Sequence, residues 1–80
     1  MLKTGNQLKA ARALIDMSQG ELAKRAGVNI NTVVFMEKRG TEDISSAADK
    51  VQAVRQALEE AGIEFLNHGQ PGVRLSKKPG

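Results

Sequence analysis

The sequence of residues 17–37 is MSQGELAKRAGVNINTVVFME, and it predicts two short helices joined by a tight turn. Ser18 and Glu21 have the spacing of a capping box, in which the hydroxyl and the carboxylate each bind a free amide at a helix start. Gly27 is placed to end the first helix, because glycine adopts the left-handed backbone at the least cost. Asn29 is a good N-cap for a second helix, which should run to about residue 38.

Helical periodicity continues on both sides of this stretch. Between residues 7 and 15, a helical stripe is formed by Leu8, Ala11, Leu14 and Ile15. Gly40 should stop the second short helix. A long helix that ends near Ala61, with Gly62 as its C-cap, is predicted by the apolar stripe Ala47, Val51, Val54 and Leu58.

The residues after the long helix change from helical to alternating periodicity. Apolar and polar residues alternate in 63–65 and 73–75, and the segment between them, which contains His68, is rich in Gly and Pro. This pattern predicts a β-hairpin. An isolated hairpin is only marginally stable, so this one must pack on the helices or pair with another chain.

Length and composition set the size and class of the fold. The chain has 80 residues, of which 40% are apolar and 26% charged, with two Phe and neither Trp nor Tyr. This is enough for one core, built from aliphatic side chains. We predict a mainly α bundle of about four helices with a short C-terminal β-hairpin. Residues 1–62 form the helical domain, 63–76 the hairpin extension and 77–80 a basic tail.

The composition argues against an enzyme. Cysteine is absent and the single histidine, His68, falls in a predicted loop, so we expect no metal site and no cofactor. Neighbouring acidic residues such as Glu59 and Glu60 would point apart on a helix, and no phosphate-binding glycine loop is present. Without cysteines, a signal peptide or a membrane-spanning stretch, the cytoplasm, near the nucleoid, is the expected location.

Charge is distributed unevenly along the chain. The net charge is +3, but residues 1–40 hold seven cations and three anions, whereas residues 41–66 hold two cations and six anions. Three more cations follow in the last ten residues. A polyanion would therefore bind the first half of the chain in preference to the second.

Residues 7–61 resemble the Cro and lambda-repressor type of helix-turn-helix protein, also called the XRE family. The resemblance lies in Gln19-x-x-Leu22-Ala23, then Gly27, then an apolar residue three positions before Glu37. It implies a lambda-repressor-like fold and a transcriptional regulator, most simply a repressor. Such a protein binds double-stranded DNA sequence-specifically by placing helix 29–38 in the major groove.

The resemblance also implies roles for individual residues. Base contacts fall to Ile30, Asn31, Val34 and Phe35. Phosphate contacts fall to Gln19, Asn29, Thr32, Lys38 and Arg39, and Gln19 also braces the reading helix. Arg12 and Glu37 match an ion pair that ties the first helix to this one.

The base-reading positions are more apolar than the family commonly has. Asn31 is the one amide among them, so we expect it to bind an adenine edge while the apolar residues contact thymine methyl groups, giving a preference for A·T pairs. In the alternative interpretation, Ile30 and Phe35 are partly buried against neighbouring helices. Gly20 near the start of its helix is unusual, and it indicates either tolerance or a close approach to DNA.

Proteins of this type usually act as dimers on half-sites one helical turn apart. The predicted hairpin is the first candidate for the dimer surface, through Leu66, Val73 and Leu75, and the end of the long helix is the second. Two other functions stay open. One is an antitoxin of the same fold with a toxin as protein partner, and the other is a protein-interaction module that does not bind DNA.

Overall fold

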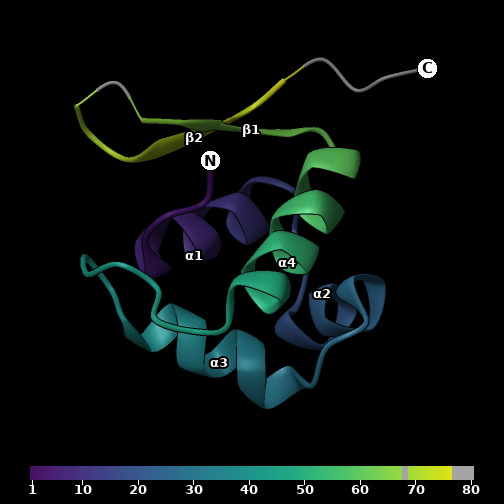
Figure 1. The fold of residues 1–80 in the computed structure, drawn as a ribbon. Coiled ribbons are helices and arrows are strands. Elements are labelled where there is room, and N and C mark those ends of the chain that lie inside the picture. Colours follow the sequence, from purple (N-terminus) through teal and green to yellow (C-terminus); the bar gives the residue numbers. More distant parts are fainter. Residues whose placement is uncertain (68, 77–80) are drawn as a thin grey trace.

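The computed structural model describes residues 1–67 and 69–76, which form four helices and one two-stranded antiparallel sheet (Figure 1). The elements are α1 (Gly5–Leu14), α2 (Gln19–Ala26), α3 (Ile30–Lys38), α4 (Ala48–Glu60), β1 (Ile63–Leu66) and β2 (Gly72–Leu75). The predicted mainly helical fold with a C-terminal hairpin is therefore confirmed. In this described part, every helix is too short or too polar to cross a membrane.

Helix α1 begins at Gly5, earlier than the predicted start at Gln7. The reason is a capping box that the prediction missed. The Thr4 hydroxyl accepts a hydrogen bond from the Gln7 amide at 3.2 Å, and the Gln7 side-chain oxygen accepts one from the Thr4 amide at 3.0 Å. This arrangement satisfies two amides at the helix start and fixes where α1 begins.

The caps predicted for α2 and α3 are largely present. The Ser18 hydroxyl accepts from the Glu21 amide at 3.0 Å. The predicted return bond is wrong, because the Glu21 carboxylate pairs with Arg25 one turn later, at 2.9 Å. Gly27 ends α2 in the left-handed conformation with φ 70°, and the Asn29 side chain caps α3 by accepting from the Asn31 amide at 2.8 Å.

One hydrophobic core joins all four helices. The largest fully buried side chains are Leu8, Leu22, Val33, Met36, Val54 and Leu58. The prediction that Ala47 belongs to the apolar stripe of the long helix is wrong. Ala47 is the exposed N-cap that precedes the first turn of α4. The helix ends at Glu60 with Ala61 as its C-cap, and Gly62 follows with φ 105°.

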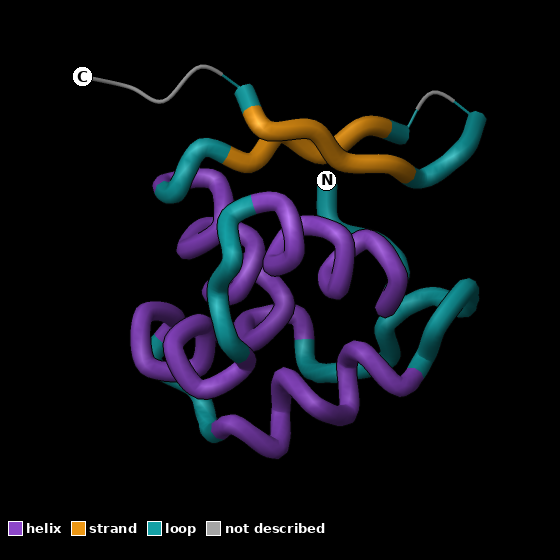
Figure 2. The backbone as a smooth tube through the Cα atoms, turned by 180° about the vertical axis from the view of Figure 1, so that it is seen from behind, coloured by secondary structure: helices purple, strands orange, loops and turns teal. Residues whose placement is uncertain are grey.

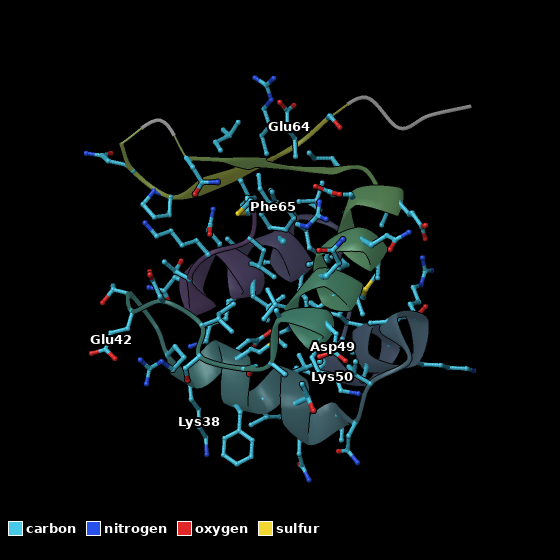
Figure 3. All side chains as sticks on the ribbon, in the orientation of Figure 1. Lys38, Glu42, Asp49, Lys50, Glu64 and Phe65 are labelled. Carbon is cyan, nitrogen blue, oxygen red and sulfur yellow. The ribbon has the colours of Figure 1, made fainter. Side chains whose placement is uncertain are left out.

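The hairpin covers one end of the helical core. Its register pairs Ile63 with Leu75 and Phe65 with Val73. Figure 3 shows Phe65 directed toward the helices and Glu64 directed away from them. The hairpin therefore packs on the helices, as one of the two predicted options required. His68 and the tail 77–80 lie outside the described residues.

A buried glutamine connects the hairpin to α1. The side-chain nitrogen of Gln7 donates to the carbonyl oxygen of Gly72 at 3.0 Å and lies 3.4 Å from that of Leu66. Gln7 is 3% exposed, so these bonds satisfy an amide group that would otherwise be costly to bury. The same residue thus starts α1 and fixes the hairpin.

The hairpin and α3 lie at opposite ends of the molecule. Figure 1 shows the two strands above the helices and α3 below them, and the reverse view in Figure 2 shows the same separation. The part of the chain that follows α4 and is described by the structure therefore leaves the outward side of α3 uncovered.

Candidate nucleic-acid interface

The outward side of α3 is formed by side chains one and four residues apart, which share one side of a helix. We call this the outer face of α3, and it consists of Ile30, Asn31, Val34, Phe35 and Lys38. Ile30 is 46% exposed and Phe35 64% exposed, Asn31 is exposed and Val34 is half-buried. The alternative in which both side chains are partly buried against neighbouring helices is therefore wrong for Phe35, whereas the end of the Ile30 side chain lies beside Gly20 of α2.

Lys38 extends over the aromatic ring of Phe35. The side-chain nitrogen lies 5.6 Å from the ring centroid, within the range of a cation–π interaction. Figure 3 shows the Lys38 side chain directed away from the body of the molecule. The outer face of α3 thus ends in a positive charge placed over an exposed aromatic ring.

The outer face of α3 carries no acidic side chain. The one acidic residue of α3 is Glu37, which is 2% exposed and points to the interior. Lys38 makes no ion pair within the described residues. An anionic partner would meet no negative charge on this helix, whereas Glu42, on the connector to α4, projects to one side of it (Figure 3).

The inner side of α3 is fixed by an ion pair with α1. The Arg12 guanidinium contacts the Glu37 carboxylate through two nitrogens, at 2.6 and 2.9 Å, and also donates to the carbonyl oxygen of Met17 at 2.9 Å. The hydrogen bond to Glu37 raises the pKa of Arg12 above its ordinary value, although burial opposes the shift. Because the pKa is raised, this stabilisation is complete at neutral pH and is lost only in strong alkali.

Gln19 completes the same arrangement from α2. Its side-chain nitrogen donates to Oε1 of Glu37 at 3.0 Å, the oxygen that also accepts the 2.9 Å bond from Arg12. This hydrogen bond joins the start of α2 to α3. Among the described residues, no buried side-chain nitrogen or oxygen lacks a hydrogen-bond partner.

The start of α1 contacts the end of α3 more closely than a side chain would permit. A Cβ atom placed on Gly5 would lie 2.6 Å from the carbonyl oxygen of Met36 and 2.8 Å from that of Glu37. Next to it, the Asn6 amide donates to the carbonyl oxygen of Gly40 at 2.8 Å. No local sequence pattern predicts this role of Gly5, because the contact joins backbones that are far apart along the chain.

Three other residues expected at phosphates are less free than Lys38. Asn29 uses its side-chain oxygen as the cap of α3, and Thr32 is half-buried. Arg39 pairs with the Glu42 carboxylate at 3.1 Å and donates to the carbonyl oxygen of Asp43 at 2.9 Å. A phosphate contact by Arg39 would require the Glu42 pair to open, a small cost for an exposed pair.

Gly20 has room for a side chain. A Cβ atom there would meet the Ile30 side chain at 3.7 Å, an ordinary contact distance. Glycine is therefore not required at this position by the packing of α2 against α3. Glycine leaves the backbone of the first turn of α2 without a covering side chain beside Ile30.

The dimer candidates lie at the other end of the molecule. Leu75 is 50% exposed, while Leu66 and Val73 are partly buried. Leu75 and Leu14 line a hollow of about 450 Å³ between α1, α2, α4 and β2, whose lining includes the charged residues Asp16, Arg25 and Glu60. This hollow is a second exposed apolar surface, separate from the outer face of α3.

Comparison with known proteins gave no match: no family model and no curated sequence is significantly similar to the chain. Within the described residues, His, Cys, Asp and Glu side chains form no cluster that could hold a metal ion. The surface of α3 itself is therefore the basis on which function is proposed.

Proposed function

We propose that the protein is a sequence-specific double-stranded DNA-binding regulator of the Cro and lambda-repressor type, with α2 and α3 as its helix-turn-helix. In this proposal α3 enters the major groove and acts as the reading helix. The observation that carries it is the contrast across α3, where the inner side is held by the core and by Glu37 while the outer face is exposed and free of acidic side chains.

The position of the positive charge supports the same proposal. Lys38 ends the outer face, where it would reach the phosphates beside the groove, and the first turn of α2 offers free amides beside Gln19. Phosphate contacts of this kind supply affinity for any sequence. Asn31 and the apolar side chains would supply the preference among sequences.

A regulator of this kind would work as a dimer. The shape of the chain restricts how two copies can pair. A two-fold axis that joined the outward surfaces of two hairpins would direct the two α3 helices away from each other, since α3 lies at the opposite end (Figure 1). The hairpins of two copies can instead pair edge to edge around an axis that runs from the hairpin to α3. This arrangement keeps the two α3 helices on the same side of the dimer. The 30 Å width of the chain then suits half-sites about 34 Å apart.

Selection of binding sites from a randomised duplex pool, using the purified protein, tests the proposal. We expect an enriched site whose affinity falls with added salt, because phosphate contacts release counterions. Asn31→Ala should weaken the preference for this site over a scrambled duplex. Reversing the charge of Lys38 and Arg39 should weaken binding to both duplexes and reduce the salt dependence. The absence of both enrichment and binding at low salt would contradict the proposal.

The exposed apolar side chains favour a second candidate, a protein-interaction module. Ile30 and Phe35 are exposed to a degree that is common at surfaces for protein partners. An antitoxin would combine this role with DNA binding, and the hollow at Leu14 and Leu75 is a place for such a partner. If the Asn31 and Lys38–Arg39 variants leave DNA affinity unaltered, the interaction module is the better explanation.

A further inference from the structure

The outer face of α3 has few groups that can hydrogen-bond to a base. Of its five side chains, Ile30, Val34 and Phe35 are apolar and Lys38 is a point charge that is drawn over the Phe35 ring. Asn31 is the one amide, and it makes no side-chain hydrogen bond within the described residues. Among these five side chains, Asn31 is therefore the one that can both donate to and accept from a base edge, and Lys38 can only donate.

The apolar side chains have a matching group in the major groove. The C5-methyl group of thymine is the apolar feature that base edges present there. Phe35 is 64% exposed and Ile30 is 46% exposed, so both would lose contact with water against such a methyl group. Cytosine carries only a hydrogen at C5 and has its amino group where thymine has O4, so it offers these side chains no matching apolar group.

We infer that the protein recognises thymine through its C5-methyl group, with Phe35 as the main specificity-determining residue. The inference depends on the proposed function and specifies what the outer face of α3 reads. Lys38, by its position over the ring, limits the orientations of Phe35 and leaves the uncovered part of the ring for the base. Asn31 would bind an adenine edge in the same or a neighbouring A·T pair.

Replacement of thymine by deoxyuridine in the selected site tests the inference, because deoxyuridine pairs in the same way and lacks only the methyl group. Each thymine of the site is replaced singly, and binding is measured at constant salt. We expect a loss of about fourfold at a contacted thymine, the effect of one buried methyl group. Thymines outside the site should tolerate the replacement.

Phe35→Ala assigns the effect to the side chain. This variant should bind the thymine duplex more weakly, and at the thymine that faces residue 35 it should no longer distinguish thymine from deoxyuridine. Leu14→Ala is a matched control, since Leu14 is 45% exposed on a different surface and should keep the full discrimination. Phe35 is outside the core, and circular dichroism will verify that the variant is folded.

The outcomes separate the inference from the proposed function. Binding of the selected site with equal affinity for thymine and deoxyuridine at every position would overturn methyl recognition and leave DNA binding intact. Discrimination that persists in Phe35→Ala would overturn the assignment to Phe35. If no duplex is bound at all, both the inference and the proposed function fail.

Discussion

The two sides of α3 belong to the same nine residues, yet they have opposite chemistry. The inner side buries Val33 and Met36 completely and holds Glu37 between Arg12 and Gln19. The outer face leaves Ile30 and Phe35 exposed although they are as apolar as the core. The comparison shows that the buried contacts of α3 come mainly from its inner side. The outer residues are therefore free to serve binding, and substitutions on the two sides should have separable effects.

The largest effect is expected on the inner side, for Glu37→Gln. It removes the charge that compensates Arg12 in a pair whose side chains are 20% and 3% exposed, and breaking such a pair costs about 3 kcal/mol. For a domain of this size that corresponds to a fall in melting temperature of about 12 °C or more. Thermal denaturation followed by circular dichroism measures it.

Glu21→Gln is the control for that variant. It makes the same chemical change in the exposed pair with Arg25, where both side chains are about half exposed, so we expect a loss of less than about 1 kcal/mol. Equal losses in the two variants would mean that the pair on the inner side of α3 does not hold the helix.

Gly5→Ala should cause the next largest loss of stability. The added methyl group would collide with backbone atoms at the end of α3, which cannot yield as a flexible side chain does. Overpacking of this kind costs about 1–3 kcal/mol. Urea denaturation will measure the loss. An alanine that leaves the denaturation midpoint unchanged would show that α1 and α3 are not as closely packed as described.

Lys38→Ala tests the outer face. Loss of one phosphate contact should weaken binding to all duplexes by about fivefold and reduce the salt slope by about one. The melting temperature should stay nearly unchanged, because surface substitutions usually alter stability by less than about 0.5 kcal/mol. Fluorescence anisotropy across a salt series gives both binding quantities. Lys9→Ala, at an exposed lysine of α1, should leave them unaltered.

Gly20→Ala should have a small effect of the opposite sign, a gain in stability. Alanine fits beside Ile30 and favours the helix, so the free energy of unfolding should rise by up to about 0.5–1 kcal/mol. If α2 approaches DNA closely at this position, affinity will fall while stability rises. A fall in stability would contradict the space found around Gly20.

The parts of the fold that were predicted correctly depend on local signals. Ser18, Gly27 and Asn29 each act on neighbouring backbone groups, so their spacing was enough to place α2 and α3. The start of α1 had such a signal in Thr4 and Gln7, and it was overlooked because the apolar stripe begins later. The alternation in 63–65 and 73–75 likewise predicted the strands.

The remaining features depend on contacts between distant residues. The position of the hairpin depends on Gln7, whose hydrogen-bond partner Gly72 is 65 residues away along the chain. The exposure of Phe35 was equally undecided, because Val33, Val34, Phe35 and Met36 are four consecutive apolar residues that surround the helix. Periodicity cannot show which of them face inward when all are apolar. The helix that carries the candidate site could be predicted, but periodicity did not decide which of its apolar residues face outward.

The most direct test of DNA binding by the outer face of α3 is an NMR titration of the labelled protein with the selected duplex. We expect the largest amide shifts at residues 29–35 and 38, with smaller ones at the start of α2. Residues 63–66 and 72–75 should move little unless binding also pairs two chains, which sedimentation of the free protein will detect. Shifts concentrated on the hairpin of a protein that stays monomeric, with α3 unaffected, would contradict the account.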